Sequence, residues 1–189
     1  MWFRICYYMM VAVLSSCQSA DKHGDTLDTS IAHNHILVAQ PDSAGHVTHI
    51  TTGSITPQQL LAYADSLKGI PYSAASTDPA YGLDCSGFVA CVFNHFHIAV
   101  PRSSVDYTFI HRQIPLKDAR PGDLILFTGT DSTVRVVGHM GIVTSSTSDT
   151  VKFIHSTSGH NKGVVETPMD AYYIRRHIKT IRVFPQNEK

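Results

Sequence analysis

The 189-residue chain lacks net charge, since 15 Lys and Arg residues balance 15 Asp and Glu residues and both signs are dispersed along the sequence. A protein that gathers nucleic acid through its electrostatic field needs an excess of cations. The even balance therefore argues against nucleic acid as a partner. The sequence also has no internal repeat, and its length predicts one ordinary domain with additional segments.

No apolar run is long enough to cross a bilayer as a helix. The N-terminal run from Ile5 to Leu14 follows Arg4 and precedes small residues, a pattern typical of a secretory signal. Its end, "LSSC", resembles a bacterial lipobox, in which the chain is cut before a cysteine that is then lipidated. We expect a signal peptide over residues 1–16 and a lipid anchor at Cys17, on a bacterial envelope membrane facing the periplasm. The alternative is a plain signal peptide with an incidental Cys17.

Cysteine is scarce, with four in the chain. Processing would remove Cys6 and acylate Cys17, which leaves Cys85 and Cys91 as thiols. These two lie on one predicted helix, point to different faces and are too far apart for disulfide geometry. A free cysteine in an exported chain needs a reason, and catalysis is one.

Residues 17–53 are rich in Asp, His, Ser, Thr and Gly, which favours a flexible tether. The predicted domain covers residues 54–189. It begins with a helix that has Thr56 as N-cap, Pro57 at its first position, Gln59 completing a capping box and Gly69 at its end.

Helices precede strands in the rest of the domain, which predicts an α+β fold with N-terminal helices packed on a central antiparallel sheet. A second helix is expected over Cys85–Phe96 and a short one near Val105–Ile110. The "RPGD" turn then introduces strands, expected at residues 124–127, 139–145, 151–156, 163–167 and 178–184.

Cys85 stands at the start of the second helix, directly after its predicted N-cap, Asp84. Unpaired backbone N–H groups and the positive end of the helix dipole meet there, an environment that favours thiolate and could hold an oxyanion. The Asp84 carboxylate would oppose the thiolate unless it turns toward backbone donors or a cationic group. The alternative is a buried structural cysteine.

Of the twelve histidines, His139 and His155 fall within predicted strands. If these strands form a hairpin whose turn centres on Thr147, the two histidines lie opposite each other on one face. One could then accept the thiol proton while the other orients it. His160, in the glycine-containing turn that follows, is expected at the substrate rim or in solvent.

Cys85, His139 and His155 could instead bind zinc with a catalytic water. Against a metal site, no close-spaced ligand accompanies Cys85 and no carboxylate stands as a partner. We therefore expect neither a metal nor a cofactor.

Five blocks in order, "LDCSGFV", "PRSS", "PGDLILF", "GHMGIV" and "FIHSTSGHNKGVVE", resemble the NlpC family of bacterial cell-wall cysteine peptidases, which are papain-like. The resemblance covers residues 56–184. It implies that Cys85 is the nucleophile, His139 the base and His155 the residue that orients it.

The same resemblance implies that Tyr72 lies near the oxyanion or the substrate amide, and that Asp84 and Ser86 hold a substrate amino group. Relatives usually follow this tyrosine with a Gly-Gly turn, which the present "YSAAS" lacks.

The implied function is hydrolysis of peptidoglycan stem peptides at the bond between γ-D-glutamate and the diamino acid, through a thioester. The alternative is a non-catalytic, wall-binding lipoprotein that retains the cleft.

Overall fold

The computed structural model describes residues 42–160 and 162–188, so the expected signal peptide, Cys17 and most of the expected tether lie outside the described residues. The helices are α1 (Pro57–Ser66), α2 (Cys85–His95) and α3 (Ala171–Arg176), with 3-10 turns at Ser104–Phe109, Leu116–Asp118 and Pro185–Asn187. The strands are β1 (Gln113–Ile114), β2 (Leu124–Thr128), β3 (Val137–Ser146), β4 (Val151–Thr157), β5 (Gly163–Pro168) and β6 (His177–Ile181).

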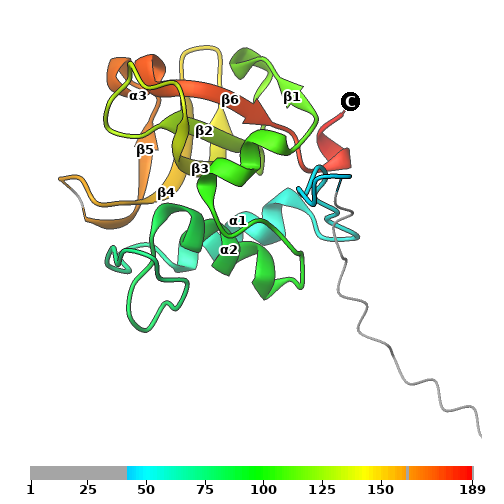
Figure 1. Ribbon diagram of the computed structural model, residues 1–189, viewed down its shortest axis with the longest axis horizontal. Coiled ribbons are helices and arrows are strands. Elements are labelled where there is room, and N and C mark those ends of the chain that lie inside the picture. Colours follow the sequence, from blue (N-terminus) through cyan, green and yellow to red (C-terminus); the bar gives the residue numbers. More distant parts are fainter. Residues whose placement is uncertain (1–41, 161, 189) are drawn as a thin grey trace, which may run out of the picture. The chain divides into compact units, whose positions relative to one another are not determined.

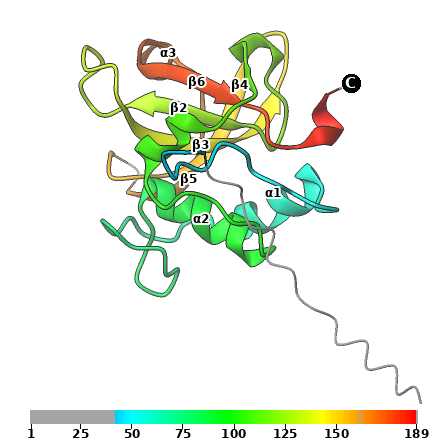
Figure 2. The same ribbon diagram turned by 45° about the vertical axis from the view of Figure 1, so that its right-hand side comes forward.

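The strands form one antiparallel sheet in the order β1-β6-β2-β3-β4-β5. Helices α1 and α2 lie together on one side of this sheet in both ribbon views (Figures 1 and 2). The predicted α+β class with an antiparallel sheet is therefore confirmed. Among the described residues, no helix has the length and apolar character needed to cross a membrane.

Strand β2 is buried along its whole length because the sheet carries a hydrophobic cluster on each face. Leu124 and Leu126 belong to the cluster that includes Leu60 of α1 and Phe88 of α2. Ile125 and Phe127 point the other way and pack with a second cluster that includes Tyr173. A strand buried on both faces is expected to be a continuous apolar run, as "LILF" is.

Both long helices begin where the sequence predicts. At α1 the capping box is complete: Thr56 N donates to Gln59 Oε1 at 2.9 Å, and Gln59 N donates to Thr56 Oγ1 at 3.3 Å. At α2 the N-cap is Asp84, whose Oδ1 accepts from Gly87 N at 2.6 Å. These caps satisfy backbone N–H groups that a helix start leaves without partners.

Residues 42–53 pack against the domain, although the sequence predicts them to be part of the tether. Ile50 is buried in the core, and His111 N donates to Thr48 O at 2.8 Å. The ring of His46 stacks on Phe109, with centroids 3.7 Å apart. The packed region therefore begins before the expected boundary at residue 54, because a few apolar contacts anchor an otherwise polar segment.

The β3–β4 hairpin has a different register from the one predicted. Ile142 pairs with Ile154, and the turn is closed by Thr147 N donating to Thr150 O at 3.0 Å. Continuing this pairing sets Gly141, and not His139, beside His155. A shift by two residues returns every side chain to the same face, so His139 still lies on the face of His155, diagonally across the pair.

Apart from the 3-10 turns at Leu116–Asp118 and Pro185–Asn187, two elements have no counterpart in the sequence-based expectation. They are the short strand β1 and the helix α3, whose N-cap Asp170 accepts from Tyr172 N at 2.9 Å and from Tyr173 N at 3.0 Å. Helix α3 is too short for a clear helical period in the sequence. It carries residues that line the candidate site.

Candidate active site

The N-terminus of α2 is held in place by the segments around it, which fixes Cys85. Ser156 Oγ, on β4, donates to Leu83 O at 2.6 Å, and Asp84 N donates to Ser76 O at 3.2 Å. A side chain at Gly87 would collide with Ser76 O, so the "DCSGF" block needs glycine at this position. The nucleophile candidate thus stands at a rigid helix start.

The charge of Asp84 is compensated by Arg102, from the "PRSS" block. Arg102 Nη2 donates to Asp84 Oδ2 at 2.6 Å, and Arg102 Nη1 donates to Asp84 Oδ1 at 3.1 Å and to Ser86 Oγ at 3.0 Å. A two-point arginine–carboxylate pair is both strong and directional. The expectation that the carboxylate turns toward backbone donors is confirmed, and Arg102 is an additional partner that the sequence analysis missed.

The role that the resemblance implies for Asp84 and Ser86, holding a substrate amino group, is not favoured by this geometry. Both side chains are buried, with their polar atoms engaged by Gly87 N and Arg102, and neither is among the residues that line the cleft. We assign them to positioning the start of α2. The loop conformation that places Asp84 at the N-cap commits its carboxylate to the helix.

His139 and His155 form a hydrogen-bonded chain that ends at Thr167. His139 Nε2 and His155 Nδ1 are 2.8 Å apart, and His155 Nε2 and Thr167 Oγ1 are 3.0 Å apart. If each histidine donates from Nε2, the chain leaves the Nδ1 lone pair of His139 unprotonated. This tautomer is the one that a general base requires. The predicted pairing of the two histidines is confirmed, and Thr167 extends it.

Burial sets the protonation states of this group. It is the main cause that lowers the pKa of His139 well below its usual value. The charge that His155 would carry if it were protonated, and the positive charge of Arg176, act in the same direction. Burial, with Arg176, also lowers the pKa of His155 to about 3. Both histidines are therefore neutral at neutral pH.

The surroundings of Cys85 work against the thiolate that a helix start favours. Burial is the main cause that raises the pKa of Cys85, and Asp84 adds to it. The backbone N–H groups of Ser86, Met140 and Cys85 itself act in the opposite direction without overcoming these causes. The resting pair is thus a neutral thiol and a neutral imidazole, and the proton must move to His139 during the reaction.

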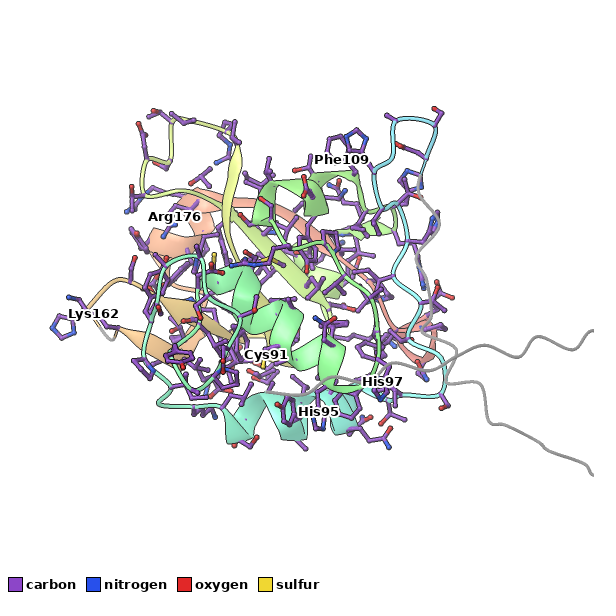
Figure 3. All side chains as sticks on the ribbon, turned by 60° about the horizontal axis from the view of Figure 1, so that its bottom comes forward. Cys91, His95, His97, Phe109, Lys162 and Arg176 are labelled. Carbon is purple, nitrogen blue, oxygen red and sulfur yellow. The ribbon has the colours of Figure 1, made fainter. Side chains whose placement is uncertain are left out.

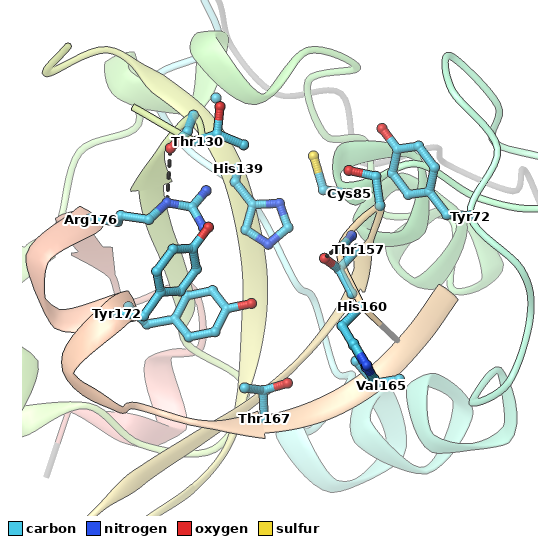
Figure 4. Close-up of a pocket in the computed structure, with 15 residues that line it drawn as sticks. Tyr72, Cys85, Thr130, His139, Thr157, His160, Val165, Thr167, Tyr172 and Arg176 are labelled. Carbon is cyan, nitrogen blue, oxygen red and sulfur yellow. Dashed lines mark hydrogen bonds between the residues drawn. The ribbon is translucent and has the colours of Figure 1, made fainter. Parts of the chain in front are cut away.

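A cavity of about 420 Å³ joins these groups. Figure 4 shows the Cys85 side chain and the His139 ring facing each other across it, with Tyr72 beside Cys85. His160 also lines the cavity from an exposed turn, as expected for the substrate rim. Tyr172, Tyr173 and Arg176 of α3 also line the cavity. Figure 4 shows Tyr172 and Arg176 on the side of His139 away from Cys85.

Tyr72 is positioned by a loop that does not need the Gly-Gly turn of relatives. Ala75 adopts the left-handed backbone conformation, with φ 58°, which glycine would adopt without strain. The loop is tied down at both ends, by Val164 N donating to Ile70 O at 2.8 Å and by Leu83 N donating to Pro71 O at 2.9 Å. Burial raises the pKa of Tyr72, so its hydroxyl stays protonated and can donate to substrate.

Several residues that contact the predicted site residues or line the cleft beside them were missed by the sequence analysis. The missed residues are Arg102, Thr167, Tyr172, Tyr173 and Arg176. A compensating cation for Asp84 could have been sought in "PRSS", but nothing in the local pattern of β5 or α3 marks the others. Among the described residues, no group of three or more His, Cys, Asp or Glu side chains is arranged to hold a metal ion.

The sequence model of the NlpC/P60 family matches residues 69–183, and the chain belongs to this family of peptidoglycan peptidases. The chain is similar to "Murein DD-endopeptidase MepS/Murein LD-carboxypeptidase" of Escherichia coli strain K12, with 28% identity over 184 residues, covering 94% of this chain and 90% of the relative. It is 29% identical over 72 residues to "Gamma-D-glutamyl-L-lysine dipeptidyl-peptidase" of Bacillus subtilis strain 168, covering 38% of this chain and 24% of that one.

A crystal structure of an NlpC/P60 family protein from Bacillus cereus ATCC 10987 has the same fold. The TM-score is 0.61 at 24% identity, and the match covers 71% of this chain and 42% of that longer one. The papain-like α+β fold implied by the sequence blocks is thereby confirmed.

Proposed function

We propose that this protein is a cysteine endopeptidase that cuts peptidoglycan stem peptides with Cys85 as nucleophile. The observation that carries the proposal is the shared cleft of Cys85 and His139, with His139 hydrogen-bonded at 2.8 Å to His155. A thiol facing a neutral, oriented imidazole is the arrangement that activates a nucleophile by proton transfer.

In the proposed mechanism, His139 takes the proton of the Cys85 thiol as Sγ attacks the carbonyl carbon of the scissile amide. In this mechanism, backbone N–H groups at the start of α2 and the Tyr72 hydroxyl stabilise the oxyanion. His139 then gives its proton to the leaving amine, and a thioester remains. Water, deprotonated by His139, hydrolyses the thioester and restores the thiol. His155 and Thr167 keep His139 in the required tautomer throughout.

The first candidate bond is that between γ-D-glutamate and the diamino acid, which the printed name of the Bacillus subtilis relative supports. The second is a bond between two D-configured residues of the crosslink. It is favoured by the match to MepS, which runs along nearly the whole chain. A non-catalytic wall-binding role remains the rival class.

Mass spectrometry of peptidoglycan fragments after incubation with the protein separates these possibilities. Cleavage at the γ-D-glutamyl bond shortens the stem to L-alanyl-D-glutamate. Cleavage of the crosslink converts dimers into monomers whose stems keep their length. Binding to the wall without new fragments would refute catalysis and support the rival role.

We further propose that the mature protein is anchored to the cell envelope by a lipid on Cys17. In the native host, the protein is expected to begin at Cys17 and to partition into detergent, as N-terminal mass analysis and phase separation would show. Cys17→Ala should yield a soluble or unprocessed form. An intact Met1, or a cut elsewhere, would refute the anchor.

Activity should persist as the pH falls through the usual histidine pKa. His139 acts as a base only when neutral, and its pKa is lowered, so protonation removes activity at a lower pH than usual. We expect kcat/KM to fall by less than about twofold between about pH 7.5 and 6, whereas an unperturbed histidine near 6.5 would lose more.

The alkylation rate of Cys85 tests whether its thiol is neutral in the resting protein. Because its pKa is raised, labelling by iodoacetamide should climb with pH through and beyond about 8.5, the usual thiol value. Site-resolved mass spectrometry distinguishes Cys85 from Cys91, which is labelled in Figure 3. The Sγ atom of Cys91 lies 4.0 Å from the hydroxyl oxygen of Tyr63 on α1. A rate that is flat from acidic to alkaline pH would indicate a resting ion pair instead.

A further inference from the structure

Arg176 is a nearly fully buried cation in the wall of the active-site cleft. Its side chain comes from α3, is 6% exposed and lines the same cavity as Cys85 and His139. Figure 4 places it beside Tyr172, on the side of His139 away from Cys85. No role for it follows from the nucleophile, the base or the residues that orient the base.

The guanidinium of Arg176 is held rigidly by backbone and rings. Nε donates to Gly129 O at 2.8 Å and Nη2 donates to Thr128 O at 2.9 Å. Its central carbon lies 4.7 Å from the ring centroid of Tyr172 and 5.6 Å from that of Tyr173. None of these contacts uses Nη1. A planar cation with one edge committed and another edge free is pre-organised for a ligand.

The charge of Arg176 has no acidic partner within the described part of the chain. Arg102 is paired with Asp84, Arg182 with Asp123 and Arg112 with Glu188, but no ion pair involves Arg176. A buried cation is costly unless an anion or several hydrogen bonds compensate it. Two carbonyl oxygens offset part of this cost, and an anion entering the cleft would offset the rest.

We propose that Arg176 is a substrate-binding residue that takes, through Nη1, a free carboxylate next to the scissile amide of the stem peptide. This assignment rests on the proposed function, since stem peptides supply the carboxylate. A γ-linked glutamate keeps its α-carboxylate free, and the diamino acid carries a second one. Arginine is the residue best suited to such recognition because its donors match the planar carboxylate.

A bound carboxylate would also act on the base. The charge of Arg176 is one of the causes that lower the pKa values of His139 and His155. An anion at Arg176 would offset that charge and make His139 a stronger proton acceptor when substrate is present. Arg176 would then couple the binding of the substrate carboxylate to the activation of His139 as a base.

The test measures peptide binding to Cys85→Ala protein, which keeps Arg176 and cannot turn substrate over. The probes are L-alanyl-γ-D-glutamyl-meso-diaminopimelate and two derivatives. One is amidated at the glutamate α-carboxylate and the other at the carboxylate on the D-centre of diaminopimelate, which stays free in longer stems. NMR titration should show that one of the amides binds at least tenfold more weakly than the free acid, a difference of about 1.4 kcal/mol. Which amide loses affinity identifies the carboxylate.

Arg176→Gln, added to the Cys85→Ala protein, should remove this discrimination, while Arg175→Gln should leave it intact. Arg175 is the matched control because it carries the same charge on the same helix but is exposed. Thermal unfolding checks that each variant is folded. If the Arg176→Gln protein does not fold, the binding of the free tripeptide and its two amides to the Cys85→Ala protein still shows whether a carboxylate is recognised.

Equal binding of the acid and both amides, or binding of none of the three, would overturn the assignment. So would a loss of discrimination in the Arg175→Gln protein equal to that in the Arg176→Gln protein. Turnover of the same tripeptide and of crosslinked muropeptides by protein with intact Cys85 tests the proposed function separately. Cleavage without discrimination would therefore refute the role of Arg176 and leave the peptidase standing.

Discussion

Replacing Cys85 with alanine is expected to lower kcat/KM on purified muropeptides by about 10⁴-fold or more, which in practice abolishes turnover. The reason is that, among the described residues that line the cleft, Cys85 is the one thiol that can form the thioester. Cys85 stands at the start of α2, and His139 faces it across the cavity. Quantifying released fragments by mass spectrometry measures the effect.

Cys91→Ala is the matched control, since it makes the same chemical change on the same helix away from the cleft. It contacts Tyr63 and is not among the cleft residues. We expect its kcat/KM to stay near that of the wild type, with a modest loss of stability. Comparable losses of activity in the two variants, with both folded, would count against Cys85 as nucleophile.

The second large effect is expected at the histidines, and it should be graded. His139→Ala removes the base and should lower kcat by about 10²- to 10⁴-fold. His155→Asn should lose only about tenfold, because an amide oxygen can still accept from His139 Nε2 and preserve the tautomer. His155→Ala should fall between them, since it leaves His139 without its 2.8 Å partner.

His160→Ala serves as the control in this series. His160 lines the cleft from an exposed turn and is not part of the hydrogen-bonded chain from His139 to Thr167. Its loss should change KM at most, with little effect on kcat. An inactive His160→Ala protein beside a nearly normal His155→Ala protein would show that the orienting residue has been misidentified.

Local sequence determined the start of each long helix and therefore the position of Cys85. Thr56 and Gln59 form the predicted capping box, and Asp84 forms the predicted N-cap. Capping depends on residues three apart in the chain, so sequence alone contains the information. Sequence also determines which side of the sheet each strand residue faces, because side chains alternate along a strand with a period of two. This alternation puts His139 and His155 on the same side of the sheet.

The register of the hairpin was decided by the tertiary structure. A pairing shifted by two residues preserves every face, so the periodic pattern is equally satisfied by both registers. The turn closed between Thr147 and Thr150 and the irregularity between Val143 and Ser145 select the observed one. The histidines meet in either case because imidazole rings can reach diagonally across a pair.

Contacts between residues distant in the chain supplied the rest of the site. Arg102 meets Asp84, Thr167 meets His155, and Arg176 reaches the cleft only because α3 folds back on Thr128 and Gly129. The protonation state of Cys85 was likewise decided by the tertiary structure. A helix start by itself favours a thiolate, but the burial of Cys85 in the assembled cleft raises its pKa, and burial depends on every segment that packs around it.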